Sequence, residues 1–182
     1  LSKNLDILFP SGDYYISNNI ATEISNGLIT AWAVNLPWVS GVNPRTVKIW
    51  NNVFYNMPSA YGIYSGDNDW TAYIYNNTFF NFSRGISRSG GTFVAKSNLI
   101  ASTTLPASGT FAAGTDYNAT ASSTMGYTVT GNGNTHDKVS QSFYFADLAN
   151  SDFHLAPFDT AALDAGTSLS ADANLSFSTD ID

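Results

Sequence analysis

Two carboxylates separated by one residue, Asp67 and Asp69, are the first side chains in this sequence that suggest chemistry. Carboxylate oxygens are ligands that Ca²⁺ prefers, so this pair is a candidate metal site. The same residue types are also ordinary in turns, and the turn interpretation stays open. A second acidic group near the end of the chain consists of Asp164, Asp172, Asp180 and Asp182. We expect no obligatory cofactor, with Ca²⁺ as the one candidate.

Aromatic side chains form a second group with possible function. The predicted ligand-binding residues are Trp50, Tyr55, Tyr73, Tyr75 and Phe80, which alternate with apolar residues and so fall on the outward face of predicted strands. Exposed aromatic rings gathered on one face mark a contact surface, on which a sugar or a protein partner would pack. Long loops such as residues 30–46 would alternatively fold back and cover these rings.

The composition excludes several classes of function. With a net charge of −7 and only seven basic residues, the chain lacks the Lys and Arg that nucleic-acid binding requires. No apolar run approaches the roughly 18 residues of a spanning helix, so we expect no membrane insertion. Cysteine is absent, which rules out disulfides and thiolate metal sites. Charged residues are only 12% of the chain, so Asn, Ser, Thr and Gly must keep it soluble, as suits an extracellular β-protein.

A repeated sequence phrase indicates the strands that would position these side chains. It reads Ile49-Trp50-Asn51-Asn52-Val53-Phe54, then Ile74-Tyr75-Asn76-Asn77-Thr78-Phe79, and more weakly Ala95-Lys96-Ser97-Asn98-Leu99-Ile100. A repeat of 20–50 residues indicates a solenoid, in which each unit buries its apolar face against its neighbours. The spacing predicts an all-β fold, a parallel β-helix, whose single-stranded right-handed form is implied by the family resemblance described below.

The phrase also predicts which residues stack. Asn52, Asn77 and Asn98 should form one corner column, in which asparagine tolerates left-handed backbone and its amide bonds along the column. Asn26 and Asn118 extend the column at similar spacing, and Leu28 aligns with Phe54. The inward residues beside it are Ile49, Ile74 and Ala95. Gly62 and Gly85 supply backbone freedom at a second bend.

The end of the chain is less regular. We expect one domain over residues 1–182, with regular coils over about 20–120 and an irregular C-terminal cap over about 121–182. Apolar strands return at 143–145 and 153–155, where His154 is expected to be a structural imidazole.

The repeated phrases resemble the right-handed parallel β-helix, or pectate-lyase-like, superfamily over residues 25–118. The segments at 145–147, 152–155, 161–166 and 180–182 are similar to the closing part of secreted bacterial surface proteins of the choice-of-anchor group. Here the usual Ser-Pro before Ala-Ile-Asp-Ala-Gly is replaced by Thr160-Ala161 before Ala162-Leu163-Asp164. This resemblance implies an extracellular or cell-surface location and says little about activity.

Lyases of this superfamily remove a proton beside a uronate carboxylate with Lys or Arg as the base. The resemblance therefore makes Arg84, Arg88 and Lys96 the catalytic candidates. The alignment puts Arg88 opposite Ser65 and near Asp67 and Asp69, where an exposed ion pair between loops is the simpler interpretation.

We expect a non-catalytic extracellular module that contacts partners or glycans through its aromatic face. The alternatives are a fragment of a polysaccharide lyase or glycoside hydrolase, and a carbohydrate-binding module. The apolar segment 5–9 shows no polar cap, and open strand edges recruit other strands, so end-to-end self-association is also expected. The predicted partners are thus a polysaccharide or another protein subunit.

Overall fold

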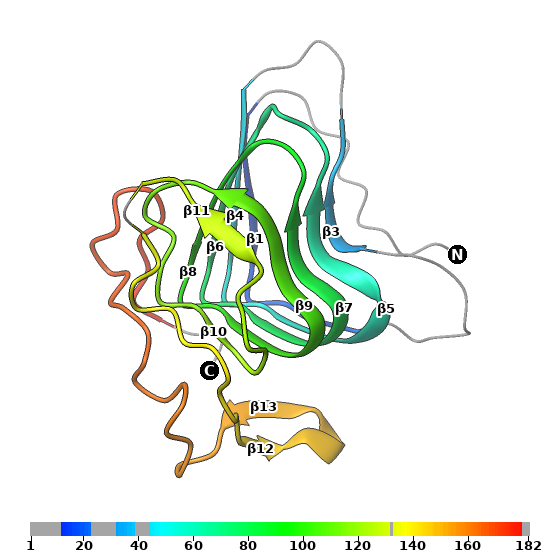
Figure 1. Cartoon of the computed structure of the whole chain (residues 1–182), viewed down its shortest axis with the longest axis vertical. Helices are drawn as coiled ribbons and strands as arrows, with labels where there is room; N and C mark the ends of the chain where they lie inside the picture. Colours follow the sequence, from blue (N-terminus) through cyan, green and yellow to red (C-terminus); the bar gives the residue numbers. More distant parts are fainter. Residues whose placement is uncertain (1–11, 23–31, 39–43, 132, 180–182) are drawn as a thin grey trace.

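The computed structural model describes residues 12–22, 32–38, 44–131 and 133–179, which consist of strands and turns with a single 3-10 turn, η1 (Leu148–Asn150) (Figure 1). One parallel sheet holds, in order, β1 (Gly12–Ser17), β4 (Arg45–Trp50), β6 (Trp70–Tyr75) and β8 (Thr92–Lys96). The other holds β10 (Ala119–Thr120), β9 (Leu99–Phe111), β7 (Thr78–Arg88), β5 (Val53–Ser65) and β2 (Ile20–Thr22). Beside this path, β3 (Trp32–Leu36) pairs with β5, and β11 (Tyr127–Val129) pairs with β9. Within these ranges no helix is long and apolar enough to cross a membrane.

Each turn of the chain adds one strand to each sheet, and we call such a turn a coil. The chain leaves β4, turns a corner and enters β5, and it repeats this path from β6 to β7 and from β8 to β9. Each strand pairs in parallel with its counterpart one coil later. The predicted all-β class with parallel sheets is confirmed, and the arrangement is compatible with a β-helix.

The inward side chains stack as the repeated phrase predicts. Ile49 pairs with Ile74 and Ile74 with Ala95, and all three are fully buried. Past the corner, Phe54, Phe79 and Ile100 stack in the same way. Because strand side chains alternate between the two faces, one apolar residue at every second position is enough to build this core.

Gly62 and Gly85 are needed for a reason other than the predicted backbone freedom. A Cβ on Gly62 would lie 2.4 Å from the carbonyl oxygen of Gly85 and 2.6 Å from the ring of Phe79. A Cβ on Gly85 would lie 2.4 Å from the carbonyl oxygen of Pro106. The two glycines let neighbouring coils approach closely.

The last part of the chain differs from the irregular coils predicted there. Residues 138–141 still bond to the preceding coil, through Lys138 N to Asn118 O and Gln141 N to Thr120 O. An antiparallel hairpin follows, made of β12 (Phe145–Asp147) and β13 (Asp152–Leu155), which projects from the coils (Figure 1). Residues 166–179, which we call the C-terminal strap, then run along the side of the stack (Figure 1).

Candidate functional site: a groove along the asparagine corner

A column of side-chain amides runs along the corner between the two sheets. The Nδ2 of Asn52 donates to Oδ1 of Asn77 at 2.9 Å, and Asn77 donates in turn to Asn98 at 3.1 Å. Each Oδ1 also accepts the backbone N–H of the preceding rung at 3.1 Å. The predicted column of Asn52, Asn77 and Asn98 is confirmed, and we call it the asparagine ladder.

Among the described residues, the rung before Asn52 is Asn19; the predicted Asn26 and Leu28 lie outside the described residues. Asn19 donates to Oδ1 of Asn52 at 3.0 Å, and Ala21 is the register partner of Phe54. The pair Asn18-Asn19 was a visible signal, but it precedes Asn52 by more than the usual spacing, because the first coil is longer.

Left-handed backbone occurs one residue before each ladder rung and not at the rung itself. The residues with positive φ at this corner are Asn18, Asn51, Asn76, Ser97 and Tyr117. This division of roles explains the doubled asparagine: the first makes the turn, and the second supplies the ladder amide. Tyr117, at φ 62°, is the one residue of this set that is neither Asn nor Ser. An aromatic residue at positive φ is a genuine outlier.

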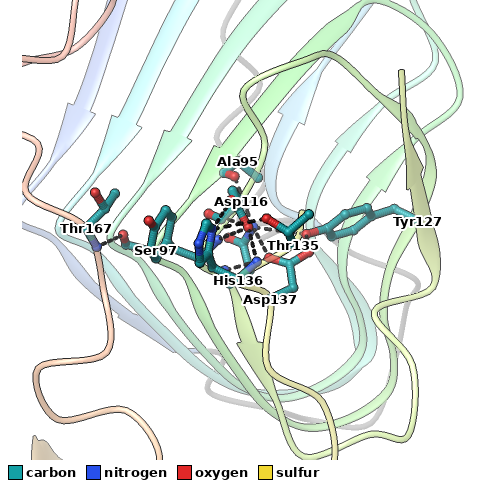
Figure 2. A network of polar contacts seen from close by, with 10 residues as sticks. Ala95, Ser97, Asp116, Tyr127, Thr135, His136, Asp137 and Thr167 are labelled. Carbon is teal, nitrogen blue, oxygen red and sulfur yellow. Dashed lines mark hydrogen bonds and ion pairs between the residues drawn. The ribbon is translucent and has the colours of Figure 1, made fainter. Parts of the chain in front are cut away.

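A carboxylate ends the ladder. Asn98 donates to Asn118 at 2.9 Å, and the backbone N–H of Asn118 donates to Oδ1 of Asp137 at 2.8 Å. The Tyr127 hydroxyl donates to the other oxygen of Asp137 (Figure 2). Burial raises the pKa of Asp137, and hydrogen bonds from Tyr127 and Asn118 offset this only in part. Asp137 was missed in the sequence because it stands in a polar stretch without the repeated phrase.

A groove of about 760 Å³ lies beside this corner, and we call it the corner groove. One wall is the corner itself, from Ile20 through Asn76 to His136. The other wall comes from residues 150–155 of the hairpin region and residues 162–166. The site therefore exists only because the end of the chain lies beside the coils.

His136 lines the groove and is held by contacts with Asp116 and Tyr117. Its Nδ1 lies 2.7 Å from one oxygen of Asp116, and its backbone N–H donates to the other oxygen at 2.8 Å (Figure 2). Its ring stacks on Tyr117 with 4.4 Å between ring centres and 6° between planes. Burial alone would raise the pKa of Asp116, but the hydrogen bonds from His136 and Tyr117 outweigh it and lower that pKa. The imidazole side chain remains 56% exposed.

The hairpin wall brings a second imidazole. The ring of His154 contacts the carboxylate of Asp152, and hydrogen bonds from His154 lower the pKa of Asp152. His154 is exposed, whereas the sequence favoured a structural role beside an inward Phe153. Phe153 instead packs outside the coils, against Tyr55 and Phe80 at 4.8 and 5.5 Å.

The predicted aromatic columns exist, but the chain covers them itself. Trp50 pairs in register with Tyr75, and Tyr75 is fully buried beneath Leu169 and Leu175 of the strap. Phe177 stacks on Trp50 at 6.4 Å, and Tyr73 packs at the edge of the same cluster. Tyr75 is fully buried, and the other four rings are partly buried, so the alternative that the chain folds back over these rings holds in place of a freely exposed surface. The cover comes from the strap and, over Tyr55 and Phe80, from the hairpin.

The three basic residues suggested by the lyase resemblance do not converge. Lys96 bonds to Asp172 at 2.6 Å, and the Arg84 guanidinium lies 5.3 Å from the ring centre of Tyr61. Arg88 pairs in register with Ser65 as predicted, but its Nε donates to the carbonyl oxygen of Gly91 at 2.7 Å. Each side chain thus has its own separate contact.

The candidate calcium residues are built into a buried ion pair. Arg45 lies 2.5 Å from Asp67, both side chains are buried, and the guanidinium sits 4.4 Å from the ring centre of Trp70. Asp69 donates its backbone N–H to the other oxygen of Asp67 at 3.1 Å. The partner of Asp67 is Arg45 and not Arg88. A guanidinium in this position competes with any cation for the carboxylate, so the geometry does not favour calcium here.

Comparison of the chain with protein-family models, with curated proteins and with solved structures finds no match.

Proposed function

We propose that this chain is a non-catalytic extracellular binding module with a right-handed parallel β-helix fold of the pectate-lyase-like kind. Parallel sheets and the asparagine ladder support the fold assignment. The cell-surface location rests on the resemblance of residues 145–147, 152–155 and 161–166 to bacterial surface proteins.

The observation that carries the non-catalytic part is the separation of Arg84, Arg88 and Lys96. A lyase needs a basic group near a second group that neutralises the uronate carboxylate, both within reach of one sugar. Lys96 is neutralised by Asp172, and Arg84 and Arg88 are engaged with a ring and a carbonyl oxygen. None of the three is arranged as a base.

The experiment is incubation of the folded protein with a panel of uronate and neutral polysaccharides. Absorbance of the unsaturated product reports lyase chemistry, and new reducing ends report hydrolysis. We expect neither. Reproducible turnover that is lost in Arg84→Ala, Arg88→Ala or Lys96→Ala would contradict the proposal and favour the lyase or hydrolase alternative.

We also propose that the module self-associates through its N-terminal edge. Within the described ranges, β1 and β2 are the end strands of their sheets, and Tyr15 and Ile20 on them are 61% and 66% exposed. Open strand edges recruit further strands. Size-exclusion chromatography with light scattering should show a species larger than 19.5 kDa at high concentration. A monomer at every concentration would remove this part of the proposal.

A further inference from the structure

We propose that the corner groove binds a long-chain fatty acid, with the carboxylate at Lys138 and the aliphatic chain along the corner. This names a ligand for the binding module and rests on that proposed function. The inference starts from the groove floor, a column of groove-lining residues that pair in register from one coil to the next. In order, the groove floor consists of Ile20, Val53, Thr78, Leu99, Ala119 and Lys138.

The groove floor is apolar up to its last residue. Each of its members directly follows a ladder rung or Asp137, and strand side chains alternate between faces, so these side chains point away from the core. Ile20 is exposed at one end, whereas Leu99 and Ala119 are buried, so the groove deepens towards Lys138. A stripe of apolar side chains left open on one side marks a site for an apolar ligand.

The opposite wall supplies a second apolar surface. Its groove-lining residues include Leu155, Ala162, Leu163 and Ala165, and the side chain of Leu163 is exposed. Ile20 and Leu163 therefore line one groove from two walls. A chain lying between the walls would remove both side chains from water, and burial of apolar surface is the main source of affinity for such a ligand.

The polar side chains at the corner have partners within the protein. Asn51 donates through Nδ2 to the carbonyl oxygen of Thr179 at 2.6 Å, and Asn76 donates to Oδ1 of Asn51 at 2.9 Å. Ser97 accepts the N–H of Thr167 at 3.2 Å. A sugar or a peptide requires many hydrogen bonds from its site, and these side chains are already engaged. The groove therefore favours an aliphatic chain.

The charges place an anionic group at the deep end. Lys138 is partly buried, and its Nζ donates to the carbonyl oxygen of Ala161 at 3.3 Å. Within the described ranges no carboxylate pairs with Lys138, and Asp152, which also lines the groove, contacts His154 instead. An ammonium has three donors, so Lys138 can bond to a ligand carboxylate as well as to Ala161. Such a charge-assisted bond is stronger in an enclosed site.

The length of the groove floor suits one acyl chain. Adjacent strands lie roughly 4.8 Å apart, so the four steps from Ile20 to Ala119 span about 19 Å. The hydrocarbon core of a bilayer is about 30 Å thick and holds two chains end to end, so one chain is about 15 Å long. The groove volume of about 760 Å³ also lies within the usual range for small-molecule sites.

The test is calorimetric titration of the full chain with dodecanoate below its micellar concentration, beside dodecan-1-ol and butanoate. We expect dodecanoate to bind, the alcohol to bind less tightly and the short acid not to bind. Lys138→Met should weaken dodecanoate binding about tenfold, because a hydrogen bond to a charged group is lost, and should leave alcohol binding unchanged. The melting temperature of each variant confirms that it is folded.

Two leucine variants test the apolar wall. Leu163→Ser, at a 45% exposed side chain that lines the groove, should weaken the binding of both dodecanoate and the alcohol about fivefold. Leu148→Ser is the matched control, since Leu148 is 44% exposed and does not line the groove. This control should leave both affinities unchanged.

Equal affinities for dodecanoate and butanoate, or for dodecanoate and the alcohol, would overturn the inference. So would equal effects of the two leucine variants, or binding to phosphatidylcholine vesicles without binding of dodecanoate, which would indicate a membrane surface as the ligand. No binding at all would also overturn it and would leave the absence of catalysis standing. Mass spectrometry of the recovered ligand separates the two proposals. Chemical conversion of bound dodecanoate would overturn the proposed function and leave the binding site standing.

Discussion

The ammonium of Lys96 lies 2.6 Å from a carboxylate oxygen of Asp172, 76 residues later in the chain. This contact ties the strap to the coils at the middle of the aromatic column, where the Tyr75 hydroxyl also reaches Asp172 at 3.5 Å. Burial, the charge of Asp172 and its hydrogen bond all raise the pKa of Tyr75, so the phenol stays protonated over the neutral range. The ion pair with Asp172 thus engages Lys96, a predicted catalytic candidate. It also helps to bury Tyr75, a predicted ligand-binding residue.

The strap should loosen in acid. Burial alone would raise the pKa of Asp172, but Lys96 and the N–H groups of Asn174 and Leu175 outweigh it and lower that pKa below its ordinary value of 3.8. A lowered pKa contributes stability that is complete above 3.8 and is lost as the pH falls through the folded-state value. Hydrogen exchange of residues 166–179, corrected for the intrinsic rate, should therefore accelerate only when the pH falls below 3.8.

Asp172→Asn should show the same accelerated exchange already at pH 7. Asp164→Asn is the matched control, since Asp164 is exposed and at positive φ, which asparagine tolerates. Equal exchange in wild type and Asp172→Asn would mean that the ion pair does not hold the strap.

Asn77→Ala should destabilise the fold by about 3 kcal/mol. The change leaves the buried backbone N–H of Asn52 without its acceptor, and an unsatisfied buried donor costs about 1–3 kcal/mol. It also removes the amide that donates to the carbonyl oxygens of Ile49 and Tyr75. Asn150→Ala, which removes an exposed bond to Asp147, should stay within about 0.5 kcal/mol. Guanidinium unfolding measures both, and equal losses would show that the ladder has no special energetic role.

Phe79→Ala should cost about 3–5 kcal/mol, as for other buried aromatic residues. Phe79 is fully buried and stacks on Phe54 at 5.4 Å. Phe158→Ala, at a 69% exposed ring, is the control with little expected effect. A loss below about 1 kcal/mol for Phe79→Ala would remove this ring from the core.

Gly62→Ala should destabilise by about 1–3 kcal/mol or more, because its Cβ would overlap the backbone of the next coil. At Gly66 the nearest atom to a new Cβ is the terminal hydroxyl of Tyr64, at 2.9 Å, which can move away. Gly66→Ala should therefore lower the melting temperature much less. The reverse order would show that the two coils are not so closely packed.

Asp137→Asn should change how stability depends on pH. Since burial raises the folded-state pKa of Asp137, the wild type gains stability as the pH falls from that pKa towards 3.8. The unfolding free energy of the wild type minus that of Asp137→Asn should rise as the pH falls towards 3.8. Below pH 3.8 this difference should stay constant. Denaturant unfolding at several pH values measures this difference. A flat profile for Asp137→Asn would contradict a buried carboxylate.

The sequence alone predicted the inward stack and the middle of the ladder. Asn52, Asn77 and Asn98 could be aligned because each stands at the same offset within a repeated phrase, and neighbouring coils pair at fixed register. The alternation of apolar residues likewise identified Ile49 and Phe79 as core. These features are local and periodic, so they can be predicted from the sequence without coordinates.

The site was decided by the tertiary structure. The ion pairs Arg45–Asp67 and Lys96–Asp172 join residues from different coils or from a coil and the strap, and no spacing rule predicts them. Asp137 and His136 lie in a coil without the repeated phrase. The strap and the hairpin pack their apolar side chains on the outside of the stack, against the outward aromatic columns. This packing of the strap and the hairpin covers the aromatic columns and forms the second wall of the corner groove.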